Sequence, residues 1–159
     1  MPDYIYLSKE GYEKLQKELE ELKHVKRPEL SQKISVARDF GDLRENAEYH
    51  AAKEALSLVE ARITQLEQSI RRAKILNKND MAKDKVTILS RVKLRDLIRN
   101  KELEYILVSP EESDFKQRKI STTSPVGKAL LGKEKGDLVE IKVPAGQLKY
   151  EILDIELSI

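Results

Sequence analysis

Two carboxylates near the first third of the chain have the residue type and the spacing that metal chemistry would need. Asp42 and Glu45 lie three residues apart in the segment Phe40-Gly41-Asp42-Leu43-Arg44-Glu45-Asn46. Carboxylate oxygens suit Mg²⁺, but two ligands are too few for an octahedral ion, so any metal must be shared with a partner. The same Asp-x-x-Glu spacing is typical of a helix cap, in which Asp42 accepts from the helix start and Glu45 favours its dipole. Spacing alone favours the cap and leaves the metal role open.

Apolar residues on both sides of this pair predict two long helices. They recur in the alternating three-and-four spacing of a coiled-coil seam. The seam residues are Tyr12, Leu15, Leu19 and Leu22 upstream, and Ala52, Leu56, Val59, Ile63, Leu66, Ile70 and Ala73 downstream. In an antiparallel hairpin, the position numbers of two facing residues add up to the same value along the whole hairpin. The pairs from Tyr12–Ala73 to Leu22–Ile63 all have the same sum. That sum puts the fold-back between Asp42 and Leu43, so the acidic pair lies at the tip of the hairpin.

Capping and breaking residues set the limits of these helices. Ser8 is a good N-cap for the first helix, which we expect to run to about Asp39. Pro28 lies inside it, and because proline removes a hydrogen bond and clashes with the preceding turn, we expect a kink or a local break there. The constant sum also rises by one past Pro28. The second helix is expected to end near Leu76.

The periodicity changes to that of strands after a polar linker. Alternating apolar residues predict strands at 86–94, 103–108, 138–143 and 150–157. Ser124 as a cap, Pro125 in the first turn and Gly132 as a stop predict one short helix between them. The fold class is therefore α+β, an N-terminal antiparallel coiled-coil hairpin followed by a small antiparallel sheet with one short helix. The predicted division is a hairpin at 1–76, a linker at 77–84 and a second domain at 85–159.

Composition excludes several function classes. The 159 residues include no cysteine, which removes disulfides, thiolate zinc sites and cysteine nucleophiles. The net charge is only +2, with both signs interspersed, so any contact with a polyanion must come from a local patch. No apolar run approaches the roughly 18 residues of a membrane span, and the start lacks a secretory leader. We expect a cytoplasmic protein with no membrane partner.

Other candidate chemical groups are weak. His24 and His50 are the only histidines, and on helical arms a solvated histidine is commoner than a ligand or a base. The chain has no serine nucleophile elbow and no phosphate-binding glycine loop, so self-contained enzyme chemistry is not expected. Arg38, Arg44 and Lys53 flank the tip. Most such charges pair along a helix surface, but those beside the acidic pair would also suit a nucleic-acid phosphate backbone.

Read as a unit, Gly41-Asp42-Leu43-Arg44-Glu45-Asn46-Ala47 and its continuation to residue 54 resemble the bacterial transcript cleavage factors of the Gre family, GreA type. The likeness covers nearly the whole chain. It includes, in the family's order, residues 11–15, 26–29, 120–121 and 124–133. Several separated motifs in the correct order are more specific than any one of them.

The resemblance implies an FKBP-like second domain that docks at the rim of the RNA polymerase secondary channel while the hairpin enters the channel. Asp42 and Glu45 would then help hold a second Mg²⁺, present only in the complex with polymerase, and position the water that hydrolyses the 3′ end of backtracked RNA. The protein would stimulate this activity of the polymerase rather than catalyse alone. By the same resemblance Arg38, Arg44 and Lys53 would steer the extruded RNA.

Ile120, Ser121, Ser124 and Pro125 match the segment with which the family contacts the polymerase rim, although ordinary capping and packing explain these residues equally well. Two other functions are open. A relative could use the same hairpin to block the channel and inhibit transcription, but family members of that kind differ at the tip. A coiled-coil adaptor or holdase without a role in transcription would bind no polymerase.

Overall fold

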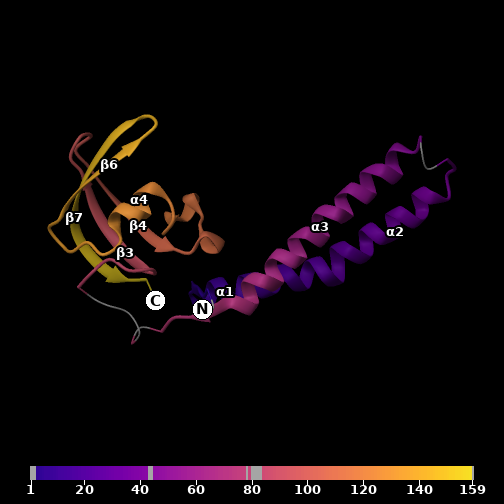
Figure 1. The fold of residues 1–159 in the computed structure, drawn as a ribbon, viewed down its shortest axis with the longest axis horizontal. Helices are drawn as coiled ribbons and strands as arrows, with labels where there is room; N and C mark the ends of the chain where they lie inside the picture. Colours follow the sequence, from indigo (N-terminus) through magenta and orange to yellow (C-terminus); the bar gives the residue numbers. More distant parts are fainter. Residues whose placement is uncertain (1–2, 43–44, 78, 80–83, 159) are drawn as a thin grey trace. The chain divides into compact units, whose positions relative to one another are not determined.

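The computed structural model describes residues 3–42, 45–77, 79 and 84–158. The chain divides into two compact units, one of Tyr12–Arg72 and one of Met1–Gly11 with Ala73–Ile159. The residues before Tyr12 and those after Arg72 belong to the same unit. Strand β1 (Ile5–Leu7) pairs there in parallel with strand β2 (Ala73–Ile75). Figure 1 shows the helical unit and the sheet unit. The division at 1–76, 77–84 and 85–159 stays a prediction.

The helical unit is an antiparallel hairpin, as the seam predicts. Its first arm contains α1 (Lys9–Glu21), a π-helical turn (Leu22–Lys26) and α2 (Arg27–Arg38). Its second arm is the single helix α3 (Ala47–Arg72), and α2 and α3 run side by side in Figure 1. The predicted first helix thus ends one residue before Asp39.

Pro28 produces a π turn rather than a break. The Arg27 N–H donates to the carbonyl of Leu22, five residues back, and both Lys26 and Arg27 keep right-handed helical dihedrals. A π turn adds one residue to a helical turn, which explains why the constant sum of facing positions rises by one past the proline. The irregularity lies in the turn before Pro28, where the expected clash with the preceding carbonyl has to be relieved.

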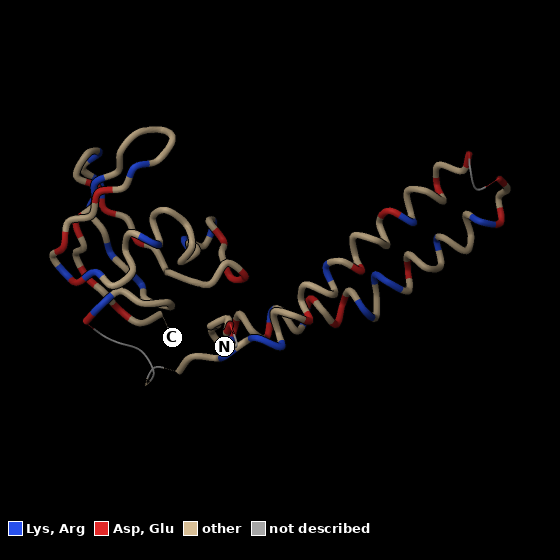
Figure 2. The backbone as a smooth tube through the Cα atoms, viewed as in Figure 1, with Lys and Arg blue, Asp and Glu red and all other residues tan. Residues whose placement is uncertain are grey.

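The interior of the hairpin is a narrow apolar seam. Leu15, Ile63 and Leu66 are buried along it, and buried Ala37 and Ala52 continue it toward the tip. Three ion pairs join the arms outside this seam: Glu18–Arg62 at 2.8 Å, Lys23–Glu67 at 3.0 Å and Arg27–Glu60 at 3.5 Å. The hydrogen bond and charge of Glu18 raise the pKa of Arg62. Positively and negatively charged residues both occur along the two arms in Figure 2.

The second helix is shorter than predicted. It ends at Arg72 rather than near Leu76 because Ala73–Ile75 form β2 and pair with β1. Ala73 therefore faces Ile5 in a sheet and not Tyr12 in the helical seam. The sequence reasoning missed both strands, since three residues are too few for a period of two to show.

Ser8 and a distant glutamate cap the start of α1. The Ser8 hydroxyl oxygen accepts from the Gly11 N–H at 3.0 Å, which confirms the predicted N-cap. The carboxylate of Glu112 accepts from the Ser8 hydroxyl at 2.6 Å and from the Ser8 N–H at 3.0 Å. A Cβ on Gly11 would collide with the Glu112 carboxyl group. A side chain at this position would therefore push the Glu112 carboxyl group aside.

The sheet unit contains a five-stranded sheet and one short helix. Its strands are β3 (Ser90–Asp96), β4 (Lys101–Val108), β5 (Lys119–Ser121), β6 (Leu138–Val143) and β7 (Gly146–Leu157). Their order is β5-β4-β3-β7-β6. Three neighbouring pairs are antiparallel, but β5 runs parallel to β4, so the sheet is mixed and not wholly antiparallel as predicted. The predicted short helix is confirmed as α4 (Pro125–Leu130).

The core of the sheet unit follows the alternation of its strands. Val92 and Leu94 of β3 are buried while Lys93 and Arg95 are exposed, the pattern of a sheet with one covered face. Leu130 of α4 is buried in the same cluster, so the short helix covers that face. Within the described residues, no helix is long and apolar enough to cross a membrane.

Candidate functional site at the hairpin tip

The end of α2 is closed by a tight turn that leads into the acidic segment. The N–H groups of Asp39 and Phe40 donate to the carbonyls of Val36 and Ala37, at 3.2 and 3.1 Å. Gly41 follows with a φ of 126°, a conformation that residues with a Cβ rarely adopt. A Cβ there would meet no atom within 4 Å. Backbone conformation rather than space therefore calls for glycine just before Asp42.

Asn46 ties the two arms together at the tip. Its side-chain N–H donates to the carbonyl of Ala37 at 2.6 Å, and its side-chain oxygen accepts from the Tyr49 N–H at 3.0 Å. Its own carbonyl accepts from the His50 N–H at 3.1 Å. One amide side chain thus caps the start of α3 and also satisfies a carbonyl at the end of α2.

The acidic pair lies outside the helix that it was predicted to cap. Helix α3 begins at Ala47, two residues after Glu45, so Glu45 is not the third residue of that helix, and the side chain of Asn46 accepts from the Tyr49 N–H in its first turn. The interpretation of Asp42 and Glu45 as a capping box for α3 is therefore wrong. Both residues are exposed, and acidic positions stand on either side of the grey segment at the tip in Figure 2.

The donor set of the tip suits a hard divalent cation. Asp42 and Glu45 offer carboxylate oxygens on an exposed turn, and these are the ligands that Mg²⁺ prefers. Among the described residues, no group of three or more His, Cys, Asp or Glu side chains is arranged to hold a metal ion. Two carboxylates can supply only part of an octahedral shell.

Two of the three predicted RNA-steering cations lie on opposite arms next to the tip. Arg38 ends α2 and Lys53 lies in α3, and both are exposed. The Lys53 ammonium lies 5.8 Å from the centre of the Tyr49 ring, and that ring makes an edge contact with His50 at 5.4 Å. Arg44 lies outside the described residues.

The histidines occupy ordinary helix-surface positions. The His24 imidazole lies 3.2 Å from the Glu20 carboxylate one turn before it, and its side chain is 67% exposed. His50 is exposed on the first turns of α3. These positions fit the expectation of solvated histidines.

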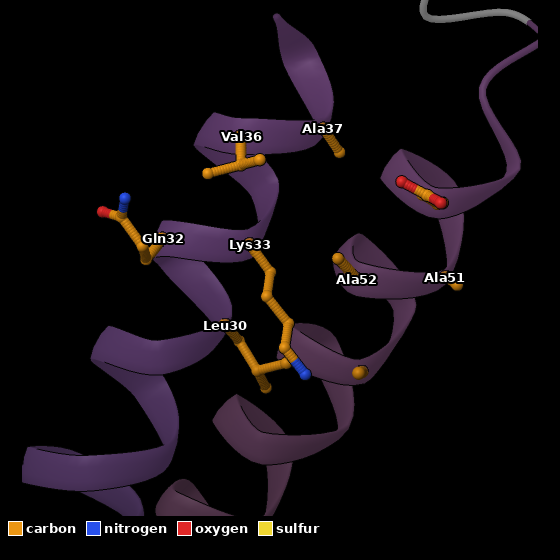
Figure 3. Close-up of a pocket in the computed structure, with 9 residues that line it drawn as sticks. Leu30, Gln32, Lys33, Val36, Ala37, Ala51 and Ala52 are labelled. Carbon is orange, nitrogen blue, oxygen red and sulfur yellow. The ribbon is translucent and has the colours of Figure 1, made fainter. Parts of the chain in front are cut away.

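A groove lies between the arms just below the tip. It has a volume of about 490 Å³, and Figure 3 shows Lys33 extending beside Leu30 between the two helices. Helix α3 contributes three alanines and Glu48 to its lining. The lining residues are Leu30, Gln32, Lys33, Val36, Ala37, Glu48, Ala51, Ala52 and Ala55.

The predicted docking residues lie between the end of strand β5 and the start of helix α4 in the sheet unit. Ser124 accepts from the Gly127 N–H at 3.1 Å and donates to the Ser121 carbonyl at 2.7 Å, so it caps α4. Ile120 packs on the core while Pro125 is exposed. A Cβ on Gly127 would collide with the Ser121 carbonyl. The capping interpretation is confirmed for Ser124. Pro125 is exposed and Ser121 is half-buried.

Family models match both units. The model described as "Transcription elongation factor, N-terminal" matches residues 5–75, and the one described as "Transcription elongation factor, GreA/GreB, C-term" matches residues 81–157. The chain belongs to the GreA/GreB family of transcription elongation factors. The resemblance stated from the motifs is thereby confirmed.

Individual members of the GreA/GreB family match over nearly their full length. Transcription elongation factor GreA of Chloroherpeton thalassium is 52% identical and covers 99% of this chain and 100% of its own length. The GreA of Chlorobium phaeobacteroides is 53% identical, with 98% of each chain covered. The crystal structure of GreA factor homolog 1 from Thermus thermophilus is 30% identical, covers 97% of this chain and 99% of its own, and has a TM-score of 0.46.

Asn46 is the tip residue whose role the sequence reasoning missed in this GreA/GreB family member. Asparagine is among the strongest N-caps, and Asn46 stands directly before the first helical residue, Ala47. That signal was available in the sequence, but the Asp-x-x-Glu spacing led to a prediction of Asp42 as the cap, four residues before Asn46. The donation to Ala37 is a contact between the arms and has no local sequence signature.

Proposed function

We propose that this elongation factor binds RNA polymerase at its secondary channel and stimulates the polymerase's own cleavage of the 3′ end of backtracked RNA. The observation that carries the proposal is that the carboxylates of Asp42 and Glu45 are exposed at the tip of the hairpin. Membership of the GreA/GreB family gives the biological process. The tip supplies the chemistry.

Asp42 and Glu45 would act as oxygen ligands at the polymerase active site. When bound, Mg²⁺ supplies Lewis-acid charge that stabilises the phosphoryl oxygens and favours a hydroxide nucleophile. The two carboxylates would provide part of the ligand set, with the rest of the shell coming from the polymerase and RNA. We therefore propose no tightly bound metal in the free protein.

Hydrolysis at this site leaves RNA that can be extended. A water oxygen attacks the phosphorus of the scissile phosphodiester, and the bond from phosphorus to the 3′ oxygen breaks. The phosphate leaves on the released 3′ fragment, and the retained strand ends in a 3′ hydroxyl. Asp42 and Glu45 orient the water and hold negative charge where the cation is needed, but the polymerase aligns the RNA. The protein is thus a stimulating factor and not an enzyme acting alone.

Basic residues on the arms would guide the extruded RNA toward the acidic tip. Arg38 and Lys53 are exposed on the two arms next to it, and contacts between such cations and phosphates weaken with salt. Arg44 is proposed for the same role from its place in the sequence. These cations offset the repulsion that two carboxylates would exert on a polyanion.

The loop of the sheet unit would hold the factor at the rim of the channel. Ser121 and Ser124 bond to one another through backbone and side-chain groups, which fixes the shape of the loop, and Pro125 projects from its exposed side. Ile120 would support the docking segment rather than contact the polymerase, because its side chain packs on the core. This docking, with a cytoplasmic location and no membrane partner, belongs to the proposal.

A cleavage assay on stalled elongation complexes tests the proposed function. Wild-type protein should release short 3′ RNA fragments, whereas Asp42→Ala with Glu45→Ala should release them no faster than polymerase alone. A matched control replaces two other exposed tip acids, Asp39→Ala with Glu48→Ala, which removes the same charge and should leave cleavage near the wild-type rate, because neither residue is a proposed metal ligand. Cleavage by the first double variant at the wild-type rate would overturn the proposal.

The same assay separates the two alternatives. A channel-blocking inhibitor would slow extension and release no fragment. An adaptor or holdase would bind no polymerase, so its addition would change neither extension nor cleavage. Binding is followed in parallel by competition with labelled wild-type factor for core polymerase.

A further inference from the structure

Phe40 is an exposed aromatic ring at the tip of the hairpin. Its side chain is 76% exposed, the highest value among the large hydrophobic residues that the structure describes as exposed. The turn that holds it is defined, because the Phe40 N–H donates to the Ala37 carbonyl at 3.1 Å. The ring is therefore presented from a fixed backbone and contributes little to the hydrophobic seam.

A single exposed apolar residue needs no explanation on an ordinary surface. Phe40 differs in its location, because only Gly41 separates it from Asp42. Two residues of extended chain span at most about 7 Å. Any phosphodiester held at the carboxylates therefore places a neighbouring base within reach of the ring.

We propose that the Phe40 ring stacks on a base of the extruded single-stranded RNA and so positions the scissile phosphodiester at the acidic tip. This inference rests on the proposed function. Base-on-aromatic stacking is a general way to hold single-stranded nucleic acid, and it tolerates any sequence because every base has a π-face. Phe40 is a positioning residue, since its ring would touch the RNA but neither the water nor the metal ligands.

The surroundings of Phe40 have the mixed character of a single-strand binding surface. Arg38 is exposed two residues before it, and on the facing arm the Lys53 ammonium lies over the Tyr49 ring. Cations that follow the phosphates and rings that stack on bases are the two components such surfaces combine. A contact between Phe40 and an apolar wall of the polymerase is the competing use of the ring, and the experiment separates the two.

The test uses full-length protein and stalled elongation complexes whose extruded RNA carries either a normal base or an abasic residue 3′ of the cleavage site. Phe40→Ala should slow cleavage at saturating factor about tenfold on the normal RNA, the scale of one base–aromatic stack. Phe40→Leu should be as slow, since it keeps apolar bulk without a π-face, and Phe40→Trp should restore the wild-type rate. On abasic RNA the wild type should slow to the rate of Phe40→Ala.

Two controls keep the result interpretable. Phe115 is 74% exposed on the sheet unit, and Phe115→Ala should leave the ratio of rates on normal and abasic RNA unchanged. Thermal unfolding of Phe40→Ala should match the wild type, because the ring is exposed. The factor concentration at half-maximal cleavage should stay within about twofold, since stacking acts after docking.

Two outcomes would overturn the stacking role. Full activity of Phe40→Leu would mean that the ring makes an apolar contact with the polymerase. An equal effect of Phe40→Ala on normal and abasic RNA would mean that the ring does not act through the base. Asp42→Ala with Glu45→Ala is assayed beside these variants. If that pair is inactive while Phe40→Ala is fully active, the stacking inference fails alone, whereas an active pair means that the proposed function itself fails.

Discussion

The two arms of the hairpin begin with the same structural need and meet it with different chemistry. The first N–H groups of any helix lack partners within the helix. At the start of α1, Ser8 accepts from the Gly11 N–H and the Glu112 carboxylate binds Ser8 in turn. At the start of α3, the neutral amide of Asn46 accepts from the Tyr49 N–H. A carboxylate is used for structure at one helix and an amide at the other.

The difference assigns the cap of α3 to a neutral side chain. A carboxylate engaged by backbone N–H groups has those donors competing with any metal for its oxygens. Because Asn46 performs the cap, Asp42 and Glu45 lie outside the helix and are exposed. The cap of α3 therefore comes from the Asn46 amide, whereas the cap of α1 is held by Glu112.

The largest expected effect comes from removing charge without changing shape. Asp42→Asn with Glu45→Gln should lower stimulated cleavage on the order of 100-fold, the scale of losing one strong electrostatic group from an active site. The midpoint of thermal unfolding should change little, because Asn46 supplies the cap of α3. Fragment release from stalled complexes and calorimetry measure the two quantities.

Glu112→Gln is the reciprocal variant. It should keep cleavage near the wild-type rate and should lower the unfolding midpoint, because a charge-assisted bond to Ser8 becomes a neutral one. The contrast between the helix starts would fail if the tip variant lost as much stability as Glu112→Gln.

A smaller effect is expected when the tip cap itself is changed. Asn46→Ala should reduce the free energy of unfolding by about 1 kcal/mol, the usual loss for an N-cap, and should slow cleavage about tenfold by loosening the turn that carries the acids. Asn46→Asp keeps a good capping oxygen but loses the N–H that donates to Ala37. Hydrogen exchange at the Tyr49 amide should therefore rise in Asn46→Ala and stay slow in Asn46→Asp. Equal exchange in both variants would show that the bond to Ala37, not the cap, protects the tip.

Most of the fold could be predicted from the local periodicity of apolar residues. The seam from Tyr12 to Leu22 predicted both the hairpin and the position of its turn. Ser124 before Pro125 predicted the start of α4. Each signal lies within a few residues of the structure that it specifies. The π turn before Pro28 was visible only as a change of register. Strands β1 and β2 were not predicted, since each has three residues and their pairing depends on a partner far along the chain.

The candidate site was predicted in its residues but not in its construction. Asp42 and Glu45 were placed at the tip from the spacing of the seam, and the family motif selected their role. The Asn46 cap had a local signal, but its bond to Ala37 and the Glu112 contact with Ser8 had none, because both join residues from different elements. The Asn46 donation to Ala37 joins the two arms, and Glu112 replaces a local partner at Gly11, the position where a capping box normally has its own glutamate.

The next expected effect is the coupling between Ser8 and Glu112. Ser8→Ala and Glu112→Ala should each destabilise the protein, and the double variant should lose about 1 kcal/mol less than the sum of the two, because both singles break the same hydrogen bonds. Denaturant unfolding of the four proteins gives this coupling. Strict additivity would mean that Glu112 stabilises the chain without binding Ser8.

The smallest and most specific effect concerns Gly11. Alanine in place of glycine inside a helix normally adds about 0.5–1 kcal/mol of stability, but here the new Cβ would collide with the Glu112 carboxyl group. Gly11→Ala should therefore bring little or no gain in the wild type, because moving Glu112 aside breaks its bonds to Ser8. In a Glu112→Ala background the obstacle is gone, and the same substitution should stabilise by the full helix-propensity amount. The two effects, measured by denaturant unfolding, should differ by about 1 kcal/mol, the value of the displaced bonds. An equal gain in both backgrounds would show that Glu112 yields without loss, and the cap at this helix start would then depend on Ser8 alone.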